Sequence, residues 1–129
     1  MVVEEKEMIV PAKYDLVVKK GEDFTFTFDI DIDGVTLNLA NATVYSQVRD
    51  DSYRGANSIA NFTVTVDGNS TPTATVSNNE INLALTDTVT ANITQTKGWY
   101  DVLVVDSAGN DTYYLEGKVA FTDSITVKA

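Results

Sequence analysis

Acidic side chains dominate the residues of this sequence that could do chemistry, and histidine and cysteine are both absent. The chain therefore lacks the commonest general base, the commonest transition-metal ligand and any thiolate nucleophile. Two carboxylates can still cleave a glycosidic bond, and Asp50, Asp51 and Asp101 are candidates for such a pair. A sugar-cleaving site also needs a cleft with aromatic platforms, whereas the single tryptophan, Trp99, lies beside an expected core strand. These residues favour a protein that is not an enzyme.

One acidic pattern begins like a calcium-binding loop. Asp29, Asp31 and Asp33 alternate with isoleucines before Gly34, so the sequence reads DIDIDG, and alternate carboxylates project to one side as hard oxygen ligands. An EF-hand loop would need a glutamate at its twelfth position, where this chain has Ala40. We therefore expect a strand with charged, solvent-facing side chains and no metal or cofactor, and we keep Asp29, Asp31 and Asp33 only as weak calcium candidates.

Charge and composition exclude several classes of partner. The 129 residues carry a formal net charge of -10, which repels nucleic-acid phosphates and anionic membrane surfaces. No stretch approaches the roughly 20 apolar residues of a membrane span, and the acidic N-terminus is unlike a secretory signal peptide. We expect a protein made in a cytoplasm that binds neither nucleic acid nor membrane and has no small-molecule substrate.

The clearest pattern in the chain is a strict alternation of apolar and polar residues. Phe24, Phe26, Phe28, Ile30 and Ile32 alternate with threonine and aspartate. A period of two over this length predicts a strand with one face in a core and the other in water.

Further short strands fill most of the remaining chain. They are expected at residues 14–18, 42–49, 59–66, 73–76, 80–85, 99–105 and 112–127, with an Asp-Gly hairpin turn at 33–34 and a polar loop at 50–57. Leu85, Val89 and Ile93 recur every four residues, which predicts a helix at 86–93 with Asp87 at or near its N-terminus. The expected fold is all-β, an Ig-like antiparallel β-sandwich of about seven to nine strands with one short helix between late strands. The sandwich domain covers 14–129, after an N-terminal arm or edge segment at 1–13.

Two residues near the end of the chain have expected structural roles. Tyr100 follows a corner, so its hydroxyl is placed to bond backbone across that corner. Gly117 interrupts the last strand and is expected at a bulge or at a close approach of two backbones. The buried side of the last strand is expected to consist of Tyr113, Leu115, Val119 and Phe121.

Residues that could contact a protein partner fall in two places. The N-terminal segment mixes charges with apolar residues and has no core role, which suits an arm that orders on a neighbouring subunit. The polar loop at 50–57 and its flank carry two arginines and a tyrosine, although a solvated loop is the simpler interpretation. The candidate partner-binding residues are Val2, Met8, Ile9, Val10, Arg49, Tyr53 and Arg54.

Four stretches of the chain resemble, in this order, small β-sandwich structural proteins of tailed bacteriophages. They are YDLVVKKGEDFTFTFDI, VTLNLANATVYSQVRDD, FTVTV and GWYDVLVVDSAGNDTYYLEGKVAFTDSIT, and the resemblance covers nearly all of residues 14–126. The motif positions that match are Gly21, Glu22, Phe24, Leu39, Asn41, Ala42, Val44, Gln47, Val48, Arg49, Tyr100, Asp101, Leu115, Glu116, Gly117 and Val119.

The resemblance implies a non-enzymatic virion structural protein, of cyanophage type, associated with the tail, baseplate or neck. It implies contacts with other virion structural proteins, multiple copies per particle and assembly in the host cytoplasm, and it carries over no catalytic residues. Two alternatives stay open: a capsid decoration protein, and a host-receptor or glycan-binding module. The glycan-binding alternative predicts exposed aromatic rings in the loops at 50–57 and 67–71, where only Tyr53 qualifies.

Overall fold

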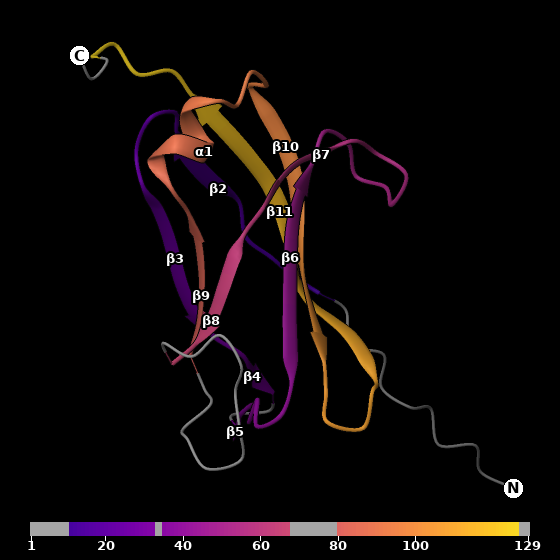
Figure 1. Cartoon of the computed structure of the whole chain (residues 1–129). Coiled ribbons are helices and arrows are strands. Elements are labelled where there is room, and N and C mark those ends of the chain that lie inside the picture. The colour runs from indigo at the N-terminus through magenta and orange to yellow at the C-terminus, as the bar shows by residue number, and fades with distance from the viewer. Residues whose placement is uncertain (1–10, 33–34, 68–79, 127–129) are drawn as a thin grey trace, which may run out of the picture.

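Two β-sheets pack face to face in the computed structural model, which describes residues 11–32, 35–67 and 80–126 (Figure 1). We call them the large sheet and the small sheet. The large sheet has the strand order β1, β11, β10, β6, β7, with β2 also paired to β11, and the small sheet has the order β3, β9, β8. The large sheet contains β1 (Ala12–Lys13), β2 (Leu16–Lys19), β6 (Thr43–Arg49), β7 (Ser58–Asn61), β10 (Lys97–Val105) and β11 (Asp111–Thr122), and the small sheet contains β3 (Phe24–Asp29), β8 (Thr63–Val66) and β9 (Glu80–Leu85).

The core fills the space between the sheets and confirms the expected all-β sandwich. Alternate residues of both inner faces are buried, as the period of two predicts. The alternating phenylalanines of β3 are only partly buried because β3 is an edge strand, and Phe26 stacks on Phe28 with ring centroids 5.2 Å apart. The most fully buried apolar side chains are Val18, Leu39, Val48, Val66, Ile81, Leu83, Val102 and Val119.

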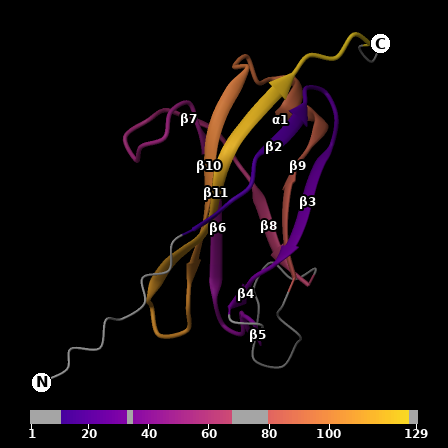
Figure 2. The same ribbon diagram turned by 180° about the vertical axis from the view of Figure 1, so that it is seen from behind.

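The pairing is not antiparallel throughout, contrary to expectation. β1 and β2 both run parallel to β11, side by side with it in the view from behind (Figure 2). The strand expected at 14–18 is interrupted because Asp15 accepts the Lys118 backbone N–H through its Oδ1 atom at 2.9 Å. A side chain thus replaces the backbone ladder at this point, and the edge is divided into β1 and β2.

The strand expected at 59–66 is in fact two strands in different sheets. The chain leaves the large sheet after β7, passes Phe62, and enters the small sheet as β8. Phe62 and Val66, which a single strand would place on the same face, are nevertheless both buried, because both sheets face one common core. Alternation along the sequence therefore could not reveal the crossing.

The last strand ends earlier than expected and contains an extra residue. The register between β10 and β11 shifts at Val102 and Leu103, which face Leu115 and Tyr113 and leave Tyr114 between them. One extra residue reverses the alternation. Tyr113, expected in the core, is therefore exposed, whereas the other three expected core residues of this strand are buried.

Gly117 lies at a close approach of two backbones, which is one of its two expected roles. It is not at a bulge, because its pairing with Tyr100 is regular. A Cβ atom at this position would lie 2.0 Å from the Tyr14 carbonyl oxygen. The Tyr100 hydroxyl donates to that same oxygen at 2.6 Å. Its partner thus lies in the junction between β1 and β2, not at the corner that precedes Tyr100. Burial raises the pKa of the Tyr100 hydroxyl, as does the neighbouring Asp15, so it remains a donor at neutral pH.

One short helix, α1 (Asp87–Ala91), lies between β9 and β10 at one end of the sandwich (Figure 1). Its N-cap is Thr86, whose side chain accepts from the Val89 N–H, and Asp87 lies in the first turn. Val89 is exposed although the four-residue spacing placed it inward, and Thr90 is buried in its place.

Thr90 fixes the helix to the turn between β2 and β3. Its hydroxyl donates to the Glu22 carbonyl at 2.9 Å and accepts the Gly21 N–H at 3.0 Å. Gly21 has a φ of +83°, a conformation that favours glycine. The helix therefore ties the end of the small sheet to a turn that begins in the large sheet.

Several expectations fall partly or wholly outside the described residues. A separate hairpin of β4 (Asp31–Ile32) and β5 (Val35–Thr36) encloses the expected Asp-Gly turn, but residues 33–34 themselves are not described. The strand expected at 73–76 and the arm residues before Pro11 also lie outside them. Among the described residues, no helix combines the length and apolar character needed to cross a membrane.

Candidate functional site

The outer face of the large sheet carries side chains in ordered rows, because the registers of β6, β10 and β11 align residues directly across the three strands. We name the rows by their positions in Figure 1, in which β6 points upward. The upper row is Arg49, Trp99 and Lys118; the middle row is Gln47, Asp101 and Glu116; and the lower row is Tyr45, Leu103 and Tyr113.

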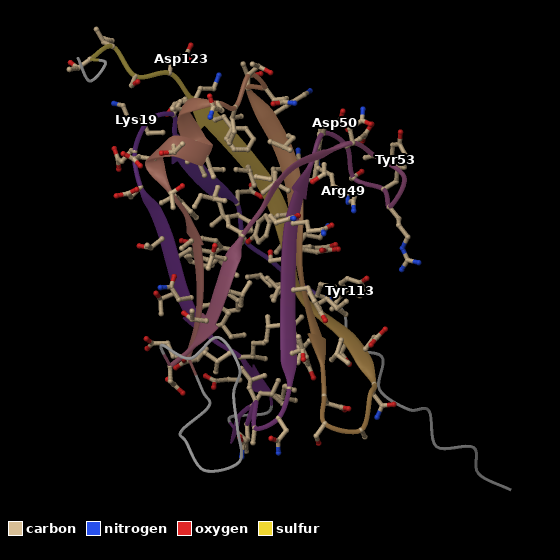
Figure 3. All side chains as sticks on the ribbon, viewed as in Figure 1. Lys19, Arg49, Asp50, Tyr53, Tyr113 and Asp123 are labelled. Atoms are coloured by element: carbon tan, nitrogen blue, oxygen red, sulfur yellow. The ribbon has the colours of Figure 1, made fainter. Side chains whose placement is uncertain are left out.

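A hollow of about 810 Å³ lies over the upper and middle rows. The loop at 50–57 borders it from the β6 side with Asp51, Ser52, Tyr53 and Arg54, and β1 and the β1–β2 junction border it from the opposite edge with Lys13 and Asp15. Tyr113 of the lower row also lines it. Figure 3 shows Tyr53 at the outer end of the loop and Tyr113 lower on the same face.

Arg49 holds the loop at 50–57 in place. Its guanidinium donates to the Ala56 carbonyl at 2.8 Å and to Gln47 Oε1 at 2.7 Å. The base of the loop is closed by Asp50 and Asn57, whose backbones bond at 2.9 Å while the Asp50 carboxylate accepts the Asn57 N–H. Arg49, predicted to contact a partner, is therefore engaged in shaping the loop.

Tyr53 and Arg54 are presented to solvent by this loop. Tyr53 is 62% exposed, and Arg54 is exposed too. Arg54 has no hydrogen bond or ion pair within the part of the chain that the structure describes, so its guanidinium is available to a ligand. The loop therefore brings an aromatic ring and a cation to the rim of the hollow.

Two carboxylates lie next to each other in the middle row. Asp101 stands directly opposite Glu116 on the neighbouring strand, an arrangement that disfavours the strand pairing because the charges are alike. Loss of hydration, followed by the charge of Glu116, raises the pKa of Asp101, while Arg49 and Arg54 act in the opposite direction. Lys13 lies 4.0 Å from Glu116. The Asp101 carboxylate accepts no hydrogen bond from the described residues and is free to accept one from a ligand.

The hollow is electrically balanced in a strongly acidic chain. Four of the chain's nine basic residues line it, including both arginines, and they face four acidic residues. A ligand that enters it therefore meets both signs of charge beside aromatic rings. The lining cations are Lys13, Arg49, Arg54 and Lys118, and the lining acids are Asp15, Asp51, Asp101 and Glu116.

The structure brings together Arg49, Tyr53 and Arg54 from the predicted partner-binding set. The other members, Val2, Met8, Ile9 and Val10, lie outside the described residues, as does Asp33 of the calcium candidates. Asp29 and Asp31 lie on β3 and β4, and no group of three metal-ligating side chains occurs within the described ranges.

Sequence reasoning missed Trp99 and Tyr113 as members of the site, whereas Asp51 and Asp101, which it named as candidates for a carboxylate pair, both line the hollow. Alternation in β10 carries a signal for Trp99, because Tyr100 and Val102 face the core and their neighbours must then face outward. No comparable signal exists for Tyr113, which turns outward only because of the extra residue in β11.

Comparisons with known proteins identify the fold. No family model matches the chain, and no curated protein matches it. The sialic acid binding region of the Streptococcus sanguinis SK1 adhesin, solved with 3'sLn, is similar with a TM-score of 0.50 and 13% identity, over 90% of this chain. The match spans 31% of that adhesin chain. At such low identity the likeness shows a common Ig-like sandwich and nothing more.

Two further similar structures have lower scores. A variant of the SrpA adhesin from Streptococcus sanguinis matches with a TM-score of 0.45 and 16% identity, over 84% of this chain and 55% of that chain. The extracellular domain of the voltage-gated sodium channel beta4 subunit matches with a TM-score of 0.44 and 11% identity, over 92% of this chain and 98% of that chain. Neither carries an argument about the site.

Proposed function

We propose that this chain is a non-enzymatic recognition domain that binds a carbohydrate in the hollow on the outer face of the large sheet. One observation carries the proposal: rings from three separate segments, Tyr53, Trp99 and Tyr113, line the same hollow as the free Asp101 carboxylate. Sugar rings present apolar C–H faces that stack on aromatic rings, and their hydroxyls bond carboxylates and amides. The open hollow offers both kinds of contact side by side.

The arrangement of Asp101 and Glu116, two of the four acidic residues that line the hollow, supports binding over cleavage by this pair. Asp101 and Glu116 project from the same face of adjacent strands, so both would lie beneath a bound sugar. Glycoside hydrolysis needs two carboxyl groups that flank the scissile bond from opposite sides. The same placement suits two acceptors that bond neighbouring hydroxyls.

The proposed setting is the surface of a bacteriophage particle, where the sugar would belong to a host cell. The sequence resemblance to small sandwich proteins of tailed phages supports this setting. A fold shared with the sialic acid binding region of a streptococcal adhesin agrees with carbohydrate recognition, although the fold alone does not specify a ligand.

A second function, a structural contact with other virion proteins, is favoured by Ile125. Its side chain is 99% exposed just beyond the end of β11. An apolar side chain so exposed is suited to burial in a partner. No residue after Lys118 lines the hollow, so attachment through Ile125 does not use the residues of the proposed sugar site.

A glycan array followed by calorimetry tests the proposed function. We expect binding to at least one saccharide, weakened about tenfold or more by Tyr53→Ala and by Arg54→Ala, since a factor of ten corresponds to about 1.4 kcal/mol. Thr27→Ala on the outer face of the small sheet is the matched control and should leave affinity unchanged. If no saccharide binds while the protein is retained on virion proteins, the structural contact becomes the function.

A further inference from the structure

The rows of the large sheet continue past the hollow. Tyr113 lines it, but Tyr45 and Leu103 of the lower row lie beyond its limits. Tyr45 is 55% exposed and Tyr113 is 36% exposed, so both rings are accessible from solvent. The lower row is therefore a second aromatic surface, continuous with the first through Tyr113.

We propose that the ligand is an extended saccharide chain of several units that lies along β10, from the hollow across the lower row. This inference rests on the proposed function and adds the length and direction of the ligand. It makes Tyr45 a binding residue even though it lies outside the hollow.

The spacing along β10 supports a multi-unit ligand. Outward-facing Trp99, Asp101 and Leu103 follow one another at every second residue, which places successive rows about 6.6 to 6.8 Å apart. The upper and lower rows are therefore about 13 Å apart. A ligand in contact with both aromatic rows must extend across the polar row between them.

The chemistry of the rows alternates in the way that a saccharide chain requires. Trp99 in the upper row and Tyr45 and Tyr113 in the lower row offer ring faces for sugar C–H groups. Gln47, Asp101 and Glu116 between them offer acceptors for hydroxyl groups. The Lys97 ammonium lies over the Trp99 ring, 5.7 Å from its centroid, in a cation–π contact that a sugar stacked on the same face would displace.

The lower row is too narrow to be a typical protein-docking surface. It is a single row bordered by the charged middle row on one side and by Thr43, Val105 and Asp111 on the other. Stable protein interfaces bury about 800 Å² on each partner, far more than one row of side chains supplies. A thin, linear ligand fits this stripe better than a second protein does.

The test is the dependence of affinity on saccharide length. The probes are size-fractionated oligomers, from monosaccharide to octasaccharide, of whichever of dextran, chitin and alginate binds best, these being a neutral, an amide-bearing and an acidic polysaccharide. We expect affinity to rise about tenfold or more between disaccharide and hexasaccharide, a gain of about 1.4 kcal/mol, and then to level off.

Three variants test whether the lower row contacts the saccharide. Tyr45→Ala should weaken hexasaccharide binding about fivefold or more and leave disaccharide binding unchanged, whereas Tyr53→Ala should weaken both. Tyr45→Phe keeps the ring and should retain hexasaccharide affinity. Equal thermal melting curves for all variants would show that folding is unaffected.

Four outcomes would overturn the inference. If oligomers bind with no length dependence, or if Tyr45→Ala changes nothing, the hollow alone holds the ligand and the proposed function survives without the extension. If Tyr45→Ala leaves all saccharide affinities unchanged but releases the protein from virions, the lower row is a protein contact. If no oligomer of any class binds, the proposed carbohydrate function fails with it.

Discussion

The outer faces of the two sheets are built to different rules, although both meet solvent. On the small sheet, two full rows across β3, β9 and β8 contain no charged and no aromatic residue. On the large sheet, the corresponding rows hold paired carboxylates, arginine and exposed rings. The small-sheet rows are Thr25, Ala84 and Thr63, and Thr27, Asn82 and Thr65.

This difference distinguishes residues that stabilise the fold from residues that are available to bind a ligand. Threonine favours strands and is compatible with solvent, so the threonines of the small-sheet rows support strand formation. Both sheets oppose two carboxylates on their outer faces, Asp101 to Glu116 on the large sheet and Asp29 to Glu80 on the small sheet, but only the large-sheet face also exposes aromatic rings, Tyr45 and Tyr113, which contribute nothing to the core. Residues that break local rules without a structural gain are characteristic of functional sites.

The largest effect is expected from a substitution that disrupts the packing of the β1–β2 junction against β11, at the edge of the large sheet. Gly117→Ala would place a Cβ against the Tyr14 carbonyl and displace the bond from Tyr100. We expect a loss of about 3 kcal/mol in the free energy of unfolding, measured by urea denaturation, since both overpacking and a lost buried hydrogen bond contribute.

Tyr100→Phe is the matched control for Gly117→Ala, because it removes the same hydrogen bond without a clash. We expect it to cost about 1 to 2 kcal/mol. A Gly117→Ala protein as stable as the parent would show that the edge can shift without penalty.

The next effect concerns the connection between the two sheets. Thr90→Val keeps the side-chain shape but leaves the Gly21 N–H and the Glu22 carbonyl without their partner. We expect a loss of about 1 to 3 kcal/mol in the free energy of unfolding. Thr88→Val, at an exposed position of the same helix, should change it by less than about 0.5 kcal/mol.

Asp101→Asn tests whether this residue serves a ligand and not the fold, because it should raise the stability of the protein and lower its affinity for saccharide. Removing one of two opposed carboxylates should stabilise the fold by about 0.2 to 1 kcal/mol, while saccharide affinity falls. A loss of both stability and affinity would contradict the idea that Asp101 is kept for a ligand.

The pH dependence of the same variant is also predicted. Because the pKa of Asp101 is raised in the folded state, its contribution to stability is fully present below the unfolded-state pKa and is lost as pH rises through the folded-state pKa. Stability relative to Asp101→Asn should therefore fall as pH rises from about 4, the usual range of an aspartate pKa. Equilibrium unfolding at several pH values measures this difference.

The smallest effect is expected from a substitution on the outer face of the small sheet. Thr27→Ala should change the free energy of unfolding by less than about 0.5 kcal/mol and leave every affinity unchanged. A measurable loss of binding would show that the small sheet also contacts the ligand, and the contrast between the two faces would no longer hold.

Local pattern predicted most of the sandwich and little of the site. Alternation placed the phenylalanines of β3 and three residues of β11, Leu115, Val119 and Phe121, on the inner side correctly, because the period of a strand is a property of neighbouring residues. It could not show the crossing at Phe62 or the extra residue Tyr114, because both depend on which strands pair.

The site itself depends on pairing between distant segments. Tyr53 and Arg54 were predicted as contact residues because a loop carries them. Trp99, Tyr113 and Asp101 join them only through the registers that set β6, β10 and β11 side by side. No segment of the sequence contains that information alone.

The parallel pairing of β2 with β11 has a mechanical consequence. The first strands of the sandwich and its last strand are hydrogen-bonded side by side and run in the same direction. A force that pulled the two ends of the domain apart would load all of these bonds together in shear, and could not open them one after another like a zip. A domain tethered at one end and held by a ligand or partner at the other would resist extension along this seam.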